Sequence, residues 1–461
     1  MAINKIYESL ASSLEDRVEL CETPTLYARD FGNLIQRQPK ILAHVRSEKD
    51  ICDVLQIANA YKMPVSIRGS GHSCNGQTLT TGIVLVHHQV SEEITPISIL
   101  EDGNVLCPSR LTWESLERTL NKHNRSCPVL TDHLETTIGG TLSVGGLGIR
   151  SIQYGAQIDQ VLKLKLILPT GKAIWCSPEE NVDLFRFSLG GLGVLGVIES
   201  VILKTIPYKP HSQPVIHDFC NSIDAVMKVE EAFKNFIETA EHTHNPDWME
   251  MALVHSYFSP AFNPRIRHSH EFFLTDQNSS PSASITDYPF IKANATKAFS
   301  NTLQNYKNIW CDYLLLPEQA LQFAKFICKI ASATQFFSCP FCIYSLAVKR
   351  PAYAPSLPLH PAPLKNTLYI SVGLYCGIEK NDSEAQMKVS EMQKIFSQLL
   401  DFCIVLGGRP YVWGEHCLTH ALNQKIYGRD YDRLLQLKRE HDPNNIISFP
   451  NLWLSTCHQV M

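Results

Sequence analysis

Residues 67–86 read IRGSGHSCNGQTLTTGIVLV and are the most informative part of the chain. The segment PVSIRG, which runs into them, alternates apolar and polar residues as a strand does, and GIVLV reads as a second strand. The loop between these strands carries Gly69, Gly71 and Gly76 around His72. Because glycine lets the backbone approach a ligand closely, this loop is a candidate binding site.

Two more glycine-rich loops follow, at residues 139–148 and 190–196. Backbone N–H groups in such loops bind phosphate well, and three loops indicate a long ligand such as a dinucleotide. The last loop matches G-x-G-x-x-G, but NVDLFRFSL before it reads as a helix and VIESVILK after it as a strand. A classical dinucleotide-binding turn has the opposite order, so we expect a different fold.

The gross composition narrows the class of protein. A chain of 461 residues predicts two lobes, and a net charge of -4 without a basic stripe argues against nucleic acid as a partner. The N-terminal residues lack the apolar core of a signal peptide, and no apolar run is long enough to span a membrane. Of the 15 cysteines, Cys339 and Cys342 form the one close pair, and their apolar surroundings favour inert core thiols over a metal site. These features predict a cytoplasmic location.

The amino-acid composition changes twice along the chain, which predicts three segments. Residues 1–208 form a first domain with its core at 37–208, residues 209–400 a second domain, and residues 401–461 a segment that returns to the first domain. Glycine becomes rarer after residue 208, and aromatic residues, proline and histidine become more frequent. The proline-rich stretch 351–366 predicts a long loop that is either a lid or a passive connector.

At this point four motifs match a known family: IRGSGHSCNGQTLTTGIVLV, TDHLETTIGGTLSVGGLG, YGAQIDQVLKLKLILPTGK and DLFRFSLGGLGVLGVIESVIL. Together they resemble the FAD-binding domain of the vanillyl-alcohol oxidase / p-cresol methylhydroxylase (PCMH-type) flavoproteins. Within that family the flavin domain is most similar to cytokinin dehydrogenases, whereas GGRPYVWGEH at residues 407–416 is closer to the aldonolactone and alditol oxidases. The resemblance implies an α+β fold, in which a two-lobed FAD-binding domain carries an inserted substrate (cap) domain with an antiparallel sheet.

The resemblance also implies roles for particular residues. His72 stands where relatives attach FAD covalently through the 8α-methyl group. His133 stands where relatives of the berberine bridge type have a second, cysteine tether, so one link is expected. Asn451 replaces a glutamine that cytokinin dehydrogenases usually carry. The remaining cofactor contacts implied are Gly69, Ser70, Gly71, Ser73 and Gln77 at the pyrophosphate, Thr137, Ser143 and Ile198 at the flavin, and Tyr411 and Ser448 closing over it.

Asp132 is the candidate catalytic base, because cytokinin dehydrogenases place an aspartate at this position beside the flavin. A carboxylate in an apolar pocket suits proton removal, since burial raises its pKa. The alternative is that Asp132 caps the turn before TTIGG. In the second domain Glu250 and Glu271 face either the substrate or solvent. Arg409 and His416 bind a substrate or have a structural role.

The expected function is hydride transfer from a small-molecule CH–NH or CH–OH donor to flavin N5, with O₂ or a quinone-like compound as the electron acceptor. Cytokinin-like amines lead the list of donors, because the flavin-domain motifs favour them. An oxidase of aldonolactones or alditols is the first alternative, and a non-catalytic flavin-binding scaffold or sensor is the second.

Overall fold

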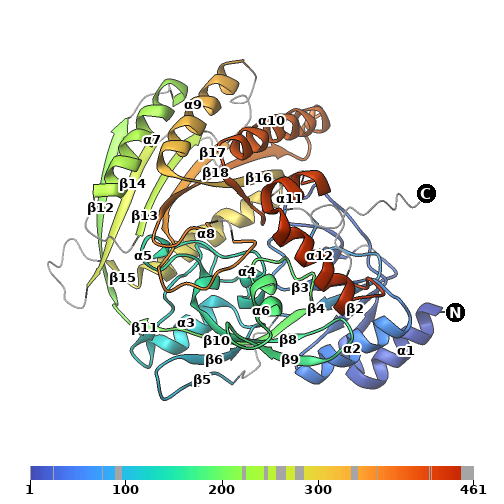
Figure 1. Ribbon diagram of the computed structural model, residues 1–461. Coiled ribbons are helices and arrows are strands. Elements are labelled where there is room, and N and C mark those ends of the chain that lie inside the picture. The colour runs from blue at the N-terminus through green and yellow to red at the C-terminus, as the bar shows by residue number, and fades with distance from the viewer. Residues whose placement is uncertain are drawn as a thin grey trace.

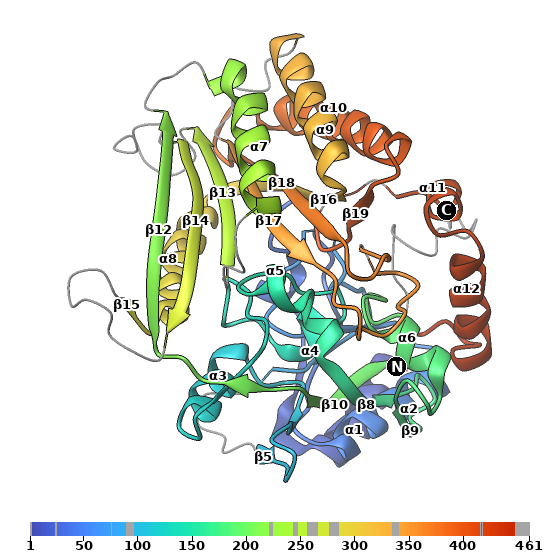
Figure 2. The ribbon, with the colours of Figure 1, turned by 60° about the vertical axis from the view of Figure 1, so that its left-hand side comes forward.

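The computed structural model describes residues 2–23, 25–74, 76–88, 96–220, 225–242, 248–255, 266–275, 285–333, 341–360, 362–414, 416 and 418–447. The N-terminal part of the chain forms one side of the molecule, and a large sheet with its helices forms the other (Figure 1). The helices α11 (His420–Tyr427) and α12 (Arg429–His441) run back along the side of the molecule to the N-terminal part (Figures 1 and 2).

The first layer is a small sheet with the strand order β1-β2-β4-β3. Both β2 and β3 pair with β4 in parallel, because α2 crosses over between β2 and β3. Ser47 caps α2 through a capping box with Asp50. The elements of this layer are α1 (Ala2–Leu14), β1 (Val18–Leu20), β2 (Ile41–His44), α2 (Glu48–Ala60), β3 (Val65–Arg68) and β4 (Ile83–Val86).

The second layer is an antiparallel sheet with the order β5-β6-β10-β8-β9. A two-stranded ribbon of β7 (Arg125–Ser126) and β11 (Ile206–Pro207) lies beside it. The strands of the antiparallel sheet are β5 (Ser98–Ile99), β6 (Val105–Pro108), β8 (Val161–Ile167), β9 (Ala173–Cys176) and β10 (Val197–Leu203). Its helices are α3 (Trp113–Asn121), α4 (Ile138–Leu142), α5 (Ser151–Tyr154) and α6 (Val182–Ser188). Helix α6 precedes the third glycine loop and β10 follows it, as the sequence predicts.

The third layer is an antiparallel sheet of eight strands with the order β15-β12-β14-β13-β17-β18-β16-β19. Its outer face is covered by α7, α9 and α10, and α8 lies near its other side (Figures 1 and 2). The strands are β12 (His211–Cys220), β13 (Trp248–His255), β14 (Ile266–Thr275), β15 (Ile285–Thr286), β16 (Tyr306–Leu315), β17 (Phe341–Lys349), β18 (Leu368–Glu379) and β19 (Arg409–Tyr411). The helices are α7 (Ala225–His242), α8 (Tyr288–Leu303), α9 (Pro317–Ala333) and α10 (Ala385–Val405).

This architecture confirms the α+β class and the antiparallel sheet expected in the middle of the chain. Helix α10 runs across residue 400, and β19 still pairs with β16 of the large sheet. The chain therefore leaves that sheet only after Tyr411.

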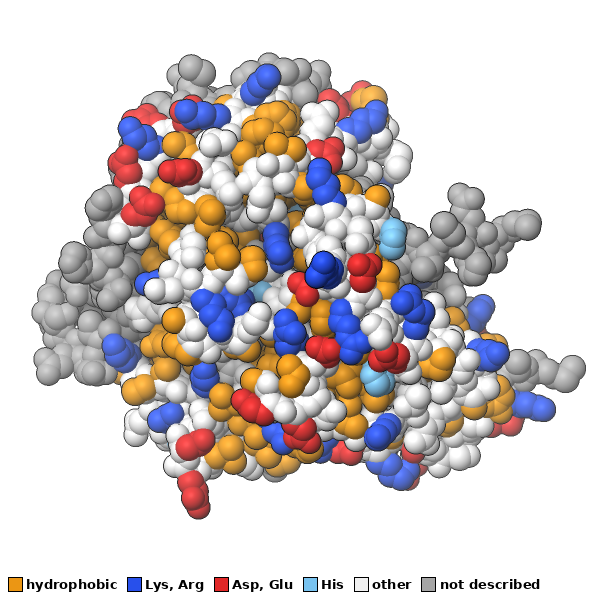
Figure 3. Space-filling view, in the orientation of Figure 1, with side chains coloured by type: hydrophobic (Ala, Val, Ile, Leu, Met, Phe, Trp, Pro, Cys, Tyr) orange, Lys and Arg blue, Asp and Glu red, His pale blue; other side chains and the backbone are white. Residues whose placement is uncertain are grey.

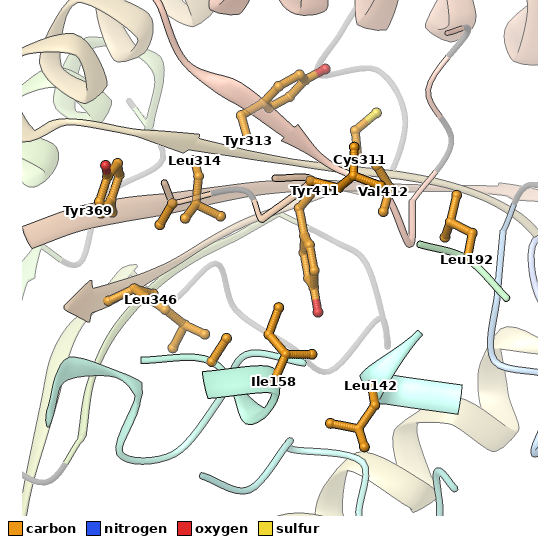
Figure 4. Close-up of a cluster of buried hydrophobic side chains, with 14 of the residues drawn as sticks. Leu142, Ile158, Leu192, Cys311, Tyr313, Leu314, Leu346, Tyr369, Tyr411 and Val412 are labelled. Atoms are coloured by element: carbon orange, nitrogen blue, oxygen red, sulfur yellow. The ribbon is translucent and has the colours of Figure 1, made fainter. Parts of the chain in front are cut away.

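A shared apolar core joins the large sheet to the second layer. Tyr411 extends from β19 with its hydroxyl toward Ile158 and Leu142 of the N-terminal part (Figure 4). Leu314 and Leu346 of the sheet pack into the same cluster. Burying apolar side chains from both parts favours their close association.

A buried ionic group crosses the same interface. Asp159 lies 3.5 Å from Arg350 Nη1 and 3.5 Å from His360 Nε2, and none of the three side chains has more than 1% exposure. Burial alone would raise the pKa of Asp159, but His360 and Arg350 outweigh burial and hold the pKa below its ordinary value. Arg350 also donates to the carbonyl of Ala362, which fastens the proline-rich stretch.

Replacing Arg350 with methionine should lower the free energy of unfolding by roughly 3–5 kcal/mol, because Asp159 keeps a buried charge without its arginine. The shift of the urea denaturation midpoint measures this. Arg433→Met is the control, since Arg433 pairs with Asp183 at the surface and should cost no more than about 1 kcal/mol. Equal effects of the two substitutions would contradict the importance of the buried group.

Candidate functional site

A cavity of about 500 Å³ lies between the glycine loops and the large sheet. The predicted base and the predicted cofactor contacts within the described part of the chain all line it: Gly69, Ser70, Gly71, His72, Ser73, Gln77, Asp132, Thr137, Ser143, Ile198 and Tyr411. Ser448 and Asn451 lie outside the described residues. The fold thus brings together positions that are more than 300 residues apart in the sequence.

The first two glycine loops pack against one another without room for a side chain. A Cβ atom on Gly69 would lie 2.1 Å from the Thr137 hydroxyl oxygen. Gly71 has a φ of +72°, a conformation that favours glycine, and a Cβ there would lie 2.5 Å from Arg68 Nη2. Ser70 Oγ donates to the Glu135 carbonyl over 2.7 Å. The cavity wall is therefore largely backbone at this point.

The second and third loops are tied together by backbone hydrogen bonds. Thr137 begins α4 as its N-cap residue and accepts from the N–H of Gly140. The N–H of Leu192 donates to the Ser143 carbonyl over 2.8 Å. Ser109 Oγ donates to the carbonyl of Ile198. All three loops consequently form one continuous wall.

His72 lies in this wall between two rings. Its ring centroid is 4.0 Å from that of Phe31 and 4.3 Å from that of His133. The pKa of His72 is well below its ordinary value of 6.5, first because burial disfavours the charged ring and second because of His133. The ring is therefore neutral and has a nucleophilic nitrogen at physiological pH.

Asp132 belongs to a charged group at the boundary between the N-terminal part and the large sheet. Its Oδ2 accepts from Tyr344 Oη over 3.0 Å and lies 3.1 Å from Lys292 Nζ. Its Oδ1 is buried and has no hydrogen-bond partner among the described residues. Neither oxygen accepts from a backbone N–H among the described residues, so Asp132 does not cap the turn before TTIGG. A donor on a bound molecule would satisfy this oxygen.

The sequence reasoning missed a second carboxylate in the cavity, that of Asp312. Its Oδ1 accepts from Tyr375 Oη over 2.9 Å, and its Oδ2 accepts from Trp413 Nε1 over 2.7 Å. Burial raises the pKa of Asp312 to about 7, although both hydrogen bonds act in the opposite direction. An aspartate inside the apolar strand IWCDYLLL was the signal that could have identified it.

The strand opposite Asp312 is built to make room for this pair. Gly373 of β18 is the register partner of Asp312 in β16. A Cβ on Gly373 would lie 2.4 Å from Asp312 Oδ1 and 2.6 Å from Tyr375 Oη. Glycine here leaves the carboxylate and the hydroxyl free to meet.

The other candidate residues lie outside this cavity or outside the description. Arg409 donates to the carbonyls of Pro358 and His360, and His416 Nε2 lies 3.0 Å from the Tyr411 carbonyl. Neither residue lines the cavity, which favours their structural role. Glu250 and Glu271 belong to β13 and β14, but their side chains lie outside the described residues.

Cys342 is buried and lines the cavity, whereas Cys339 lies outside the described residues.

Among the described residues, no group of three or more His, Cys, Asp or Glu side chains could hold a metal ion. In the same residues no helix is both long and apolar enough to cross a membrane. The face in Figure 3 mixes cationic, anionic and apolar side chains.

Comparison with known proteins gives a family for part of the chain. Residues 39–177 match the family described as FAD binding domain. An uncharacterized oxidoreductase from the fasciation locus of Rhodococcoides fascians is 33% identical over 175 residues, which cover 38% of this chain and 39% of that protein. Cytokinin dehydrogenase 1 of Arabidopsis thaliana is 30% identical over 209 residues, which cover 44% of this chain and 36% of that protein. The chain thus matches less than two fifths of the length of these curated relatives.

Solved structures resemble the whole chain. Xylooligosaccharide oxidase from Myceliophthora thermophila C1 superimposes with a TM-score of 0.73 at 15% identity, over 98% of this chain and 99% of that one. The 6-hydroxy-D-nicotine oxidase of Arthrobacter nicotinovorans gives 0.71 at 16% identity, over 94% of this chain and 97% of that one. At such identities the likeness establishes the fold.

Replacing Asp312 with asparagine should change how stability depends on pH. The folded pKa is about 7 and the ordinary carboxyl value is 3.8. Between these two values the folded state therefore retains a proton that the unfolded chain has released. The contribution of Asp312 to the free energy of unfolding is fully present below about pH 4 and is lost as pH rises to about 7. The free energy of unfolding of the wild type, relative to Asp312→Asn, should fall by up to about 1.4 kcal/mol per pH unit across this window.

Urea denaturation at several pH values measures that difference. The control is Asp382→Asn, because the hydrogen bond from Lys388 lowers the pKa of Asp382, which is partly exposed. This control should show no comparable fall between pH 4 and 7. A flat difference for Asp312→Asn would mean that the Asp312 carboxyl titrates as an ordinary one.

Proposed function

We propose that this chain, whose residues 39–177 match an FAD binding domain and whose fold resembles those of two solved oxidases, is an FAD-dependent oxidoreductase acting on a small molecule. The observation that carries the proposal is one cavity that joins three glycine loops, a neutral histidine and two carboxylates. A scaffold or sensor without catalysis would need the loops but neither of the two carboxylates.

The residues around the cavity fit a flavin dinucleotide. At Gly69 and Gly71 a side chain would clash with neighbouring groups, so backbone alone faces this part of the cavity. Gly69, Ser70, Gly71, Ser73 and Gln77 would hold the pyrophosphate, and Thr137, Ser143 and Ile198 the flavin. Tyr411 would close over it. A bound flavin supplies a two-electron acceptor for hydride.

His72 is the proposed covalent tether. The neutral ring in the cavity wall has the nucleophilic nitrogen that bond formation requires. Phe31 and His133 contact its ring and restrict its orientation. Because His133 stands where a second tether would need a cysteine thiol, we propose a single covalent link to the flavin.

Asp132 is the proposed catalytic base, with its unpartnered Oδ1 accepting the substrate proton. Tyr344 and Lys292 hold the other oxygen and so fix the direction of the carboxylate. The facing sheet excludes water with aromatic side chains, among them Trp310 and Tyr375. This arrangement suits oxidation of a CH–NH or CH–OH donor, because both reactions remove a proton from N or O while hydride leaves carbon.

The substrates named for the relatives leave both donor classes open. A cytokinin-like amine and an aldonolactone or alditol are both candidates. We expect O₂ or a quinone-like compound to take the electrons from the reduced flavin, and the cytoplasmic location stays a prediction.

Removing the tether should release the flavin. After acid precipitation and gel electrophoresis, the wild-type chain should keep flavin fluorescence, and His72→Ala should lose it because no nucleophile remains at the attachment point. The control is His123→Ala, an exposed histidine of the same part of the chain, which should stay fluorescent. Flavin released from the wild type by acid would contradict the covalent link, and a wild-type protein without any flavin would contradict the proposed function.

The Asp132→Asn variant should keep its flavin, but the donor should reduce this flavin about 10²- to 10⁴-fold more slowly, because an amide cannot accept the substrate proton. Anaerobic bleaching of the flavin absorption, with donors found in a screen of amines, polyols and lactones, measures the rate. Glu135→Gln is the matched control, since Glu135 lies three residues away and pairs with Lys297 at the surface. An unchanged rate in Asp132→Asn would assign the base to another group, with Asp312 next to be tested.

A further inference from the structure

We propose that Lys292 selects the substrate class, so that the site oxidises hydroxyl-bearing donors in preference to amines. This inference rests on the proposed function and deepens it. Lys292 lies on α8, with Nζ 3.1 Å from Asp132 Oδ2 and 3.4 Å from Tyr344 Oη. Only 13% of its side chain is exposed, so its charge is directed into the cavity rather than into solvent.

Helix α8 presents a polar stripe to the cavity. Lys292, Thr296 and Ser300 all line it, at the four-residue spacing that places side chains on one face of a helix. The stripe thus offers one cation and two hydroxyls to the cavity, with the cation beside the proposed base. Lys297, on the same helix, is 54% exposed and pairs with Glu135 instead. The two lysines of α8 therefore have separate environments.

Oxidation of a hydroxyl group fits this arrangement. The O–H bond breaks and its proton goes to Asp132 Oδ1, while the neighbouring carbon gives hydride to the flavin and a C=O bond forms. O₂ or another two-electron acceptor then takes the two electrons from the flavin. Negative charge develops on the substrate oxygen during proton removal, and the Lys292 ammonium lies beside the base to stabilise it.

Oxidation of an amine is disfavoured by the same charge. The amine is a cation before it loses its proton, and hydride loss from the neutral amine leaves a cationic C=N product. When Asp132 takes the proton, the negative charge beside Lys292 on that carboxylate is lost. Two positive charges then share a partly buried site, where Coulomb repulsion is stronger than in water.

The second carboxylate of the cavity does not reverse this preference. Both oxygens of Asp312 already accept hydrogen bonds, from Tyr375 and from Trp413. Burial also raises its pKa to about 7, so at neutral pH a large share of Asp312 is uncharged. The negative charge that it offers to a cationic substrate is correspondingly small.

Two readouts test the role of Lys292. The first is anaerobic flavin reduction by matched donors, such as benzyl alcohol and benzylamine. The second needs no turnover and follows binding of benzoate and of benzamidine, an anion and a cation of similar shape, through the flavin difference spectrum. The FAD-loaded wild type is compared with Lys292→Met and Lys292→Gln, which remove the charge, and with Lys292→Arg, which keeps it. Lys297→Met is the matched control on the same helix.

We expect the wild type to prefer the alcohol and to bind benzoate more tightly than benzamidine. Both neutral variants should lose at least about tenfold in alcohol rate and in benzoate affinity, without a matching loss for the amine. Lys292→Arg and Lys297→Met should keep the wild-type preference. Unchanged ligand preference in Lys292→Met and Lys292→Gln, or a wild type that prefers amine and cation, would overturn the inference. A wild type that binds these ligands but reduces its flavin with no donor of either class would contradict the proposed function instead, and the binding data would still decide the role of Lys292.

Discussion

The close approach of backbone segments at the glycine loops is the constraint on which the rest of the structure depends. Thr137 occupies the space that a side chain on Gly69 would need, and Gly146 leaves the same kind of space for Gln157. Hydrogen bonds from the third loop to the Ser143 and Leu142 carbonyls then close the wall. A side chain at either glycine would push the loops apart, because the clash would be with atoms fixed by neighbouring elements.

The large sheet forms the side of the cavity that faces the glycine loops. Tyr411 reaches from β19 into the shared core, and Gln77 Nε2 donates to the Val412 carbonyl, so the first glycine loop is linked to the end of that sheet. Asp159, Arg350 and His360 add a buried ionic contact across the interface. Such a contact has a large desolvation cost and is strict about geometry, which is why it fixes the position of one part relative to the other.

The cavity holds two carboxylates in unlike surroundings. Asp132 is ion-paired with Lys292 and keeps one oxygen without a partner among the described residues. Asp312 has no ion pair in the described structure, accepts two neutral donors and has a raised pKa. Sites that transfer protons often hold two carboxylates whose different surroundings give them different roles. In this chain, the difference arises because α8 brings a lysine to one acid, whereas the sheet surrounds the other with aromatic side chains.

The sequence alone determined the local elements and the first wall of the site. Apolar periodicity is a local signal, and the helix before and the strand after residues 190–196 were read correctly for that reason. The three glycine loops and His72 were also visible, because a loop rich in glycine is a short-range pattern.

Only the tertiary structure decided which side chains face that wall. Asp312 meets Trp413 across 101 residues, and Lys292 meets Asp132 across 160, in each case through strand register and helix placement that no local pattern encodes. Arg409 and His416 were also candidates from the sequence, but Arg409 donates to the Pro358 and His360 carbonyls and His416 lies beside the Tyr411 carbonyl, and neither lines the cavity. Burial and long-range contact, which set the pKa of Asp312 and the partner of Asp132, exist only once the sheet has closed over the loops.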